Sequence, residues 1–179
     1  MYRVLGEREK ALPYSERATR LVGGFEELYY CRMLSAANLL VDIGQLDQAE
    51  QAYQTSLRYS QDKKETVLIW QNLLGLARLA LHRGNASQAL SYIEQIQIPP
   101  EKFPLYWWFD VHLHWNNLTR YQVYHANGDP RAERALDEAY QTLQEYAGRI
   151  EDEEMRRSFL ENLPWNKEIM ALWKSREGG

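Results

Sequence analysis

The sequence predicts an all-α fold in which antiparallel helix pairs stack into a solenoid with a helical cap at its C-terminal end. A glycine-containing corner recurs about every 40 residues, and apolar residues spaced i, i+3, i+4 and i+7 follow each corner. The 179 residues include only 10 glycines and 6 prolines, which disfavours long irregular loops. A period near 40 with two helices in each repeat is typical of helical solenoids.

Three short strings mark the corners: Gly44-Gln45-Leu46-Asp47, Gly84-Asn85-Ala86-Ser87 and Gly128-Asp129-Pro130-Arg131. Glycine suits the left-handed residue that commonly ends a helix. Asn85 and Asp129 are favourable N-caps for the helix that follows. The three glycines are 40 and 44 residues apart, and a weaker corner at Gly6 lies 38 residues before the first of them.

Each corner is expected to join a long helix to a shorter one. The long helices are predicted over residues 25–43, 63–82 and 104–127. The second is expected to start after Asp62, because Glu65 three residues later completes a capping-box pattern. The shorter helices carry small and apolar residues on one face, which lets neighbouring helices approach closely.

After residue 150 the pattern changes to two helices that could cover the last apolar face of a solenoid, as such ends require. The first is predicted over residues 151–162, and Pro164 separates it from the second. One side of the first is expected to carry Met155, Phe159, Leu160 and Leu163, and the second carries Trp165, Ile169, Leu172 and Trp173.

Aligned on the corners, the repeats resemble tetratricopeptide repeats, in which small residues of the two helices pack together. The matching small residues are Ala37 with Ala49 and Ala77 with Ala89, and the third unit departs from the pattern at Tyr121 and Glu133. Units longer than the usual 34 or so residues resemble the C-terminal repeats of large bacterial signalling ATPases and maltose-regulator-like transcription regulators. The resemblance implies a single domain with a half unit at 1–22, units at 24–60, 63–98 and 103–148, and capping helices at 150–175.

Composition argues against several classes of partner. Lys and Arg total 21 against 25 Asp and Glu, a net charge of −4, whereas nucleic-acid binders usually carry a clustered basic surface. No segment approaches the roughly 20 apolar residues that cross a bilayer, and the charged N-terminus lacks a secretory signal. We therefore expect a cytoplasmic protein with no direct nucleic-acid or membrane partner.

Catalytic and cofactor motifs are missing from the sequence: it has no G-x-S-x-G, no P-loop and no H-E-x-x-H. His112 and His114 are two residues apart, so on a helix they point to different sides. A metal site needs ligands that converge from several elements, and the single cysteine offers no thiol pair. We therefore expect no enzymatic activity, no cofactor and no metal.

The resemblance places a binding groove along the long helices. The positions expected to face it are Asn38, Asp42, Arg78, His82, Trp115, Gln122 and His125. Trp108 and Trp115 lie on one helical stripe that could add aromatic anchors, although a long helix buried on several sides would show the same pattern. The lysine that holds a terminal carboxylate in some relatives is replaced by Leu34, Leu74 and Leu118, so that mode of binding is not supported.

The favoured hypothesis is a non-catalytic interaction module, the C-terminal arm of a larger bacterial regulator, which binds a helix or an extended peptide in its groove. The alternative is an arm that senses a small molecule or a signal peptide. Because the first unit has only its short helix, two further hypotheses stay open: the chain belongs to a longer protein, or its N-terminal half unit self-associates.

Overall fold

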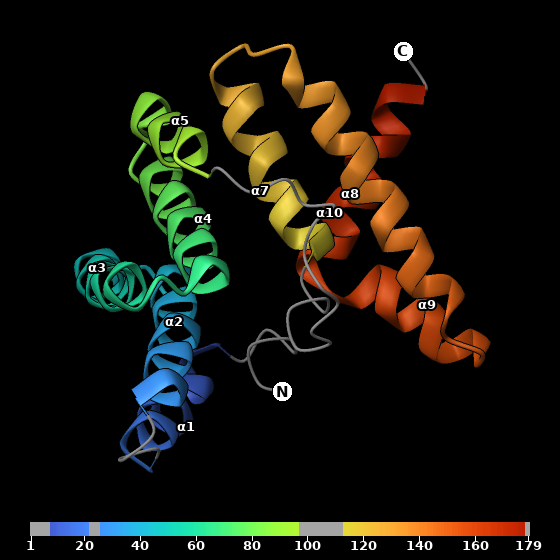
Figure 1. The fold of residues 1–179 in the computed structure, drawn as a ribbon. Helices are drawn as coiled ribbons and strands as arrows, with labels where there is room; N and C mark the ends of the chain where they lie inside the picture. The colour runs from blue at the N-terminus through green and yellow to red at the C-terminus, as the bar shows by residue number, and fades with distance from the viewer. Residues whose placement is uncertain (1–7, 22–25, 97–112, 178–179) are drawn as a thin grey trace. The chain divides into compact units, whose positions relative to one another are not determined.

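The structure is a computed structural model that describes residues 8–21, 26–96 and 113–177, and every regular element in these ranges is a helix (Figure 1). The prediction of an all-α fold is therefore confirmed. The chain forms two compact units, Met1–Gln97 and Ile98–Gly179, each described below by itself. Within the described ranges, no helix is long and apolar enough to cross a membrane.

Unit 1 is a succession of five helices, each packed against the next along the chain (Figure 1). They are α1 (Arg8–Leu21), α2 (Glu26–Asp42), α3 (Leu46–Lys63), α4 (Thr66–His82) and α5 (Ala86–Glu94). Helix α2 also packs against α4, so the first helices of successive pairs touch. The expectation of a long helix followed by a shorter one is confirmed for α4 and α5, with 17 and 9 residues, but is wrong for α2 and α3, with 17 and 18 residues. The expected helix over 25–43 agrees closely with α2.

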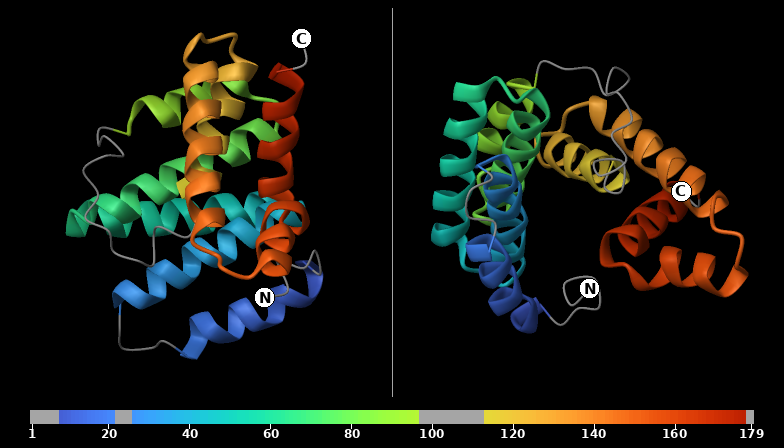
Figure 2. Two further views of the ribbon diagram at one scale, coloured as in Figure 1. Left: turned by 90° about the vertical axis from the view of Figure 1, so that its right-hand side faces the viewer. Right: turned by 60° about the horizontal axis from the view of Figure 1, so that its bottom comes forward.

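Unit 2 contains one helix pair and the two C-terminal helices (Figure 2). The helices among its described residues are α7 (Leu113–Ala126), α8 (Arg131–Gly148), α9 (Glu153–Asn162) and α10 (Pro164–Glu177). Helix α10 packs against all three of the others, so it holds the unit together. The expected start of the third long helix near residue 104 lies outside the described residues, and its observed end is one residue earlier than predicted.

The three predicted corners are confirmed in their backbone conformation. Gly44, Gly84 and Gly128 have φ angles of +79°, +72° and +63°, which only glycine adopts without a steric penalty. At each corner the residue after the glycine donates its backbone N–H to the carbonyl five residues earlier, at 2.9 Å in all three cases. This is the Schellman pattern, which satisfies carbonyls left open at the end of a helix. The weaker corner at Gly6 lies outside the described residues.

The two predicted caps act in slightly different ways. The Asn85 Oδ1 atom accepts a hydrogen bond from the Gln88 backbone N–H, the usual N-cap bond. The Asp129 Oδ1 atom accepts instead from the Arg131 backbone N–H, two residues ahead. Both side chains therefore accept a backbone hydrogen bond at the start of the next helix. Helix α8 begins just beyond Pro130.

The predicted start of the second long helix after Asp62 is wrong. Helix α3 continues to Lys63, and Lys64 then adopts the left-handed conformation with a φ of 57°. The Glu65 backbone N–H bonds to the Ser60 carbonyl at 2.8 Å, so this end repeats the Schellman pattern without a glycine. The helix is longer than expected because its buried stripe extends to Ser60, and packing outweighs the local capping signal.

The core of unit 1 contains the small residues on which the resemblance rests. Ala37, Ala49, Ala77 and Ala89 each have 0 % of their surface exposed. Tyr53 is equally buried, and its ring lies so close to Gly75 that a Cβ atom there would come within 2.2 Å of it. Small side chains on α4 thus make room for a large one from α3.

Helix α9 corrects one expectation about the C-terminal helices. Phe159, Leu160 and Leu163 are half-buried as expected, but Met155 is 67 % exposed. The reason is that Met155 lies in the first turn, where the Asp152 cap sets the helix start and α9 has no buried residue. The separation at Pro164 is confirmed: it begins α10, which buries Trp165 and Ile169.

Candidate functional site

In unit 1 the structure brings two predicted groove residues, Asn38 and Arg78, into direct contact. The Arg78 Nη2 atom donates to Asn38 Oδ1 at 2.6 Å, and the Tyr53 hydroxyl donates to the same oxygen at 2.7 Å. Asn38 and Arg78 are buried, with 8 % and 7 % of their surface exposed. One amide oxygen thus connects α2, α3 and α4.

The repeat register explains why these residues meet. Asn38 lies six residues before Gly44, and Arg78 lies six residues before Gly84. Because α2 packs against α4, equivalent positions of successive pairs face each other. The sequence pattern placed both residues on one surface. It did not identify Tyr53 as their partner, because an aromatic residue at that position predicts only a buried side chain.

Asp42 and His82 are the accessible members of the predicted set in unit 1. They lie two residues before their corner glycines, Asp42 partly exposed and His82 exposed. Each is the last residue of its helix, α2 or α4. A side chain on a partner could reach these two residues without displacing the core.

In unit 2, two of the predicted residues, Trp115 and Gln122, contact the C-terminal helix α10. The buried Trp115 ring lies 5.5 Å from the Trp165 ring, and Gln122 Nε2 donates to Glu168 Oε1 at 2.7 Å. His125 is exposed and stacks on Tyr121 at 5.4 Å. Trp108 lies outside the described residues, so the proposed Trp108–Trp115 stripe has one described member.

Charges near these residues are mixed. Burial raises the pKa of the Tyr121 hydroxyl, and the nearby carboxylates of Glu133 and Glu168 raise it further. The neutral form of this hydroxyl is therefore favoured mainly by burial, with a smaller contribution from the two carboxylates.

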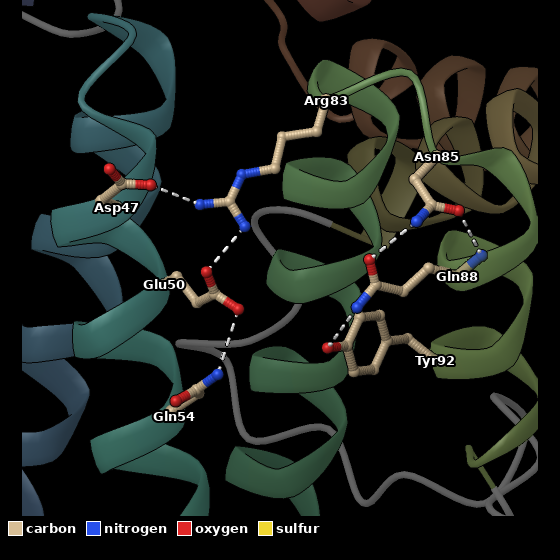
Figure 3. Close-up of polar contacts among 7 residues, drawn as sticks. All are labelled: Asp47, Glu50, Gln54, Arg83, Asn85, Gln88 and Tyr92. Atoms are coloured by element: carbon tan, nitrogen blue, oxygen red, sulfur yellow. Dashed lines mark hydrogen bonds and ion pairs between the residues drawn. The ribbon is translucent and has the colours of Figure 1, made fainter.

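Two arginines each hold a pair of carboxylates from a neighbouring helix. At the end of α4, Arg83 contacts Asp47 at 2.7 Å and Glu50 at 2.6 Å, and these contacts raise the pKa of its guanidinium (Figure 3). In unit 2, Arg176 contacts Asp137 at 2.5 Å and stacks on Trp173 at 3.9 Å. These contacts lie on the surface and link α3 to the end of α4 in unit 1, and α8 to α10 in unit 2.

A buried histidine in unit 2 lies among aromatic rings. His114 is buried in unit 2, with its ring 5.4 Å from the Tyr146 ring and 6.0 Å from the Phe159 ring. In the part of the chain that the structure describes, no group of three or more His, Cys, Asp or Glu side chains could hold a metal ion. The buried side chains of Asn38, Asn72 and Arg78 connect helices of unit 1 to one another.

Comparison with known proteins gives one match. A search of curated proteins and a search of solved structures each found nothing similar. A family model matches residues 14–177, a range that runs from within α1 to the end of α10 and takes in both units. That model is TP_0123_C, and its description is a C-terminal domain. The chain belongs to the TP_0123_C family of C-terminal domains.

Proposed function

We propose that this chain is a non-catalytic protein-interaction domain, the C-terminal arm of a larger bacterial regulatory protein in the cytoplasm. Tetratricopeptide-like helix pairs would present a groove that binds a helix or an extended peptide. The description of its family as a C-terminal domain supports the position in a larger protein.

The regular corner is the observation that carries this proposal. Three helix pairs end their first helix with the same glycine conformation and the same backbone hydrogen bond. Alanines with 0 % exposure bring the helices of the first two pairs together. A repeated helix pair of this kind creates an extended surface rather than a catalytic pocket, and such surfaces are typically used to bind proteins.

The buried members of the predicted set are unsuitable for testing the groove. Replacing Arg78 or Trp115 would disturb the packing, so a lost partner could reflect a damaged fold. His82 and His125 are exposed and lie on the long helices α4 and α7. A change at either position should leave the core intact.

The experiment places a photoreactive amino acid at His82 or His125 in the full chain. We expect both to crosslink to the same protein in extracts of the source cells. Unlabelled wild-type chain should compete, whereas an Asp42→Lys/His82→Glu variant should compete at least about tenfold less well, because charge reversal at a contact costs a few kcal/mol. Circular dichroism of that variant should match the wild type.

Matched controls carry the same photoreactive group at Arg58 on α3 and Glu145 on α8, which are exposed but lie on the second helices of their pairs. Equal crosslinking at the controls would contradict a groove on the long helices. A thermal-shift screen separates the alternative function. A specific rise in melting temperature with one metabolite, and no competed protein crosslink, would favour a ligand-sensing arm.

A further inference from the structure

The methionines in the described part of the chain differ in how far their side chains reach solvent. Met155 lies in the first turn of α9 and is 67 % exposed. Met33 on α2 and Met170 on α10 are half-buried. A reagent dissolved in water therefore reaches the Met155 sulfur more easily than the other two sulfur atoms.

A hydrogen bond adds a second difference between Met155 and Met170. The Gln144 Nε2 atom on α8 donates to the Met170 Sδ atom at 3.3 Å. A thioether sulfur is a weak acceptor, and this bond engages one of its lone pairs. Met170 is thus shielded both by the packing of α10 against α8 and by its own hydrogen bond.

The Met155 side chain can change without disturbing the fold of unit 2. No residue of α9 is buried, and Phe159, later on the same helix, is half-buried. The Met155 backbone N–H donates to Asp152 Oδ1 at 2.8 Å, and this capping bond does not depend on the side chain. Chemistry at the sulfur can therefore take place in the folded protein.

We propose that Met155 is a site of reversible oxidation by hydrogen peroxide. A lone pair of the sulfur attacks one peroxide oxygen and the O–O bond breaks. The departing hydroxide takes the proton of the transferred oxygen, so the products are methionine sulfoxide and water. Sulfur is oxidised and peroxide is reduced. The sulfoxide makes an exposed apolar side chain polar, and methionine sulfoxide reductases convert it back to the thioether.

Peptide mapping by mass spectrometry during treatment of the full chain with hydrogen peroxide tests the proposal. The peptide with Met155 should gain one oxygen atom at least about tenfold faster than the peptides with Met33 and Met170, because oxidation follows exposure. In concentrated urea, where the fold is lost, the three rates should converge. Methionine sulfoxide reductase should then remove the oxygen from Met155 in the folded chain.

The Met155→Leu variant is the matched control for the effect on the fold. After brief treatment with peroxide, the wild type and this variant should have the same helix content by circular dichroism and the same melting temperature. Equal oxidation rates at Met155 and Met170 in the folded chain would overturn the proposal. So would a loss of helix content in the wild type that Met155→Leu does not show.

Discussion

The two units share a backbone corner but differ in how they treat buried polar side chains. Asn72 in unit 1 and Asn116 in unit 2 lie twelve residues before their corner glycines, and both have 0 % exposure. Asn72 Nδ2 donates to Ser56 Oγ at 2.9 Å and to the Leu68 carbonyl at 2.8 Å, whereas its Oδ1 atom has no partner among the described residues. Neither amide atom of Asn116 has a hydrogen-bond partner among the described residues.

This difference shows that a helix corner and a buried amide have different structural requirements. A corner needs only its own backbone and one residue in the left-handed conformation, which is usually glycine, so it recurs wherever such a residue recurs. A buried amide needs a matching group on another helix, and unit 1 supplies Ser56 on α3. Burying an amide with no partner costs about 1–3 kcal/mol, so we expect the two units to respond differently to the same substitutions.

The largest expected effect is at Gly75, nine residues before the corner glycine of α4. Alanine is usually the better helix residue by about 1 kcal/mol, but here its Cβ would lie 2.2 Å from the Tyr53 ring. That ring is buried and held by Asn38, so Gly75→Ala should lower the free energy of unfolding by about 3 kcal/mol. The equivalent residue in unit 2 is Thr119, and Thr119→Ala should cost only about 1 kcal/mol.

Urea denaturation measures both variants of that pair, and hydrogen exchange resolved by segment assigns each loss to its unit. Equal losses in the free energy of unfolding at the two positions would contradict the close packing of the Tyr53 ring on α3 against Gly75 on α4.

Replacing a buried asparagine with leucine should have opposite consequences in the two units. Asn38→Leu removes the acceptor for Arg78 and Tyr53, and should lower the free energy of unfolding by about 2–3 kcal/mol. Asn116→Leu removes an amide with no partner among the described residues, and should leave the free energy of unfolding unchanged or raise it by about 1 kcal/mol.

Chemical denaturation of the two variants beside the wild type gives the comparison. Tyr53→Phe is the control for Asn38→Leu, because it removes one of the two hydrogen bonds and should cost about 1 kcal/mol. A loss of similar size for Asn116→Leu would mean that its amide is satisfied after all.

The corners should behave alike in both units. Gly84→Ala and Gly128→Ala each place a Cβ on a left-handed residue, at a cost of about 1–2 kcal/mol. No heavy atom lies within 4 Å of the new Cβ at either glycine, so backbone strain is the whole effect. Lys64→Gly should do the reverse and stabilise unit 1 by up to about 1 kcal/mol, since Lys64 already has a φ of 57°.

Thermal and urea unfolding of the three corner variants provide the check, with Lys63→Gly as a control in ordinary helical backbone. If Lys64→Gly were as destabilising as Lys63→Gly, the result would contradict a left-handed conformation of Lys64.

The smallest effect is a pH dependence that only the third corner should show. Hydrogen bonds from the Arg131 side chain and backbone lower the pKa of the Asp129 carboxyl. The carboxylate therefore stabilises the fold above the pKa of an unfolded aspartate, near about 4, and this contribution is lost as the pH falls through the lower folded pKa. Asp129→Asn should remove that part of the acid dependence.

Hydrogen exchange at the start of α8 between about pH 5 and about pH 3 follows this loss at the corner itself. The corner at Gly84 carries the neutral Asn85 and serves as the internal control. Identical acid responses at both corners would rule out a role for Asp129.

Sequence reasoning succeeded where local chemistry decides the structure. The corner glycines, the Asn85 cap and the break at Pro164 depend on neighbouring residues only, and each lies where the pattern predicts. The start of α4 was missed because Asp62 and Glu65 form a convincing local signal, whereas the buried stripe of α3 that overrides it is a tertiary effect.

The candidate site was harder to predict for the same reason. The repeat register brought Asn38 and Arg78 to one surface correctly, but whether a groove position is open depends on what packs over it. The Tyr53 hydroxyl on α3 donates a hydrogen bond to Asn38, and side chains of α10 contact Trp115 and Gln122. The periodicity of a single helix does not show which side chains of other helices pack over a given position.

The packing of each helix in unit 1 against the next one along the chain has a consequence for how the unit folds. Its principal contacts join helices that are adjacent or next but one, so little chain must be looped before a contact can form. Each helix can therefore dock on a helix that has already left the ribosome, and α2 to α5 can assemble in order of synthesis. A truncation at the C-terminal side would then shorten unit 1 by whole helices, and the earlier pairs would still form.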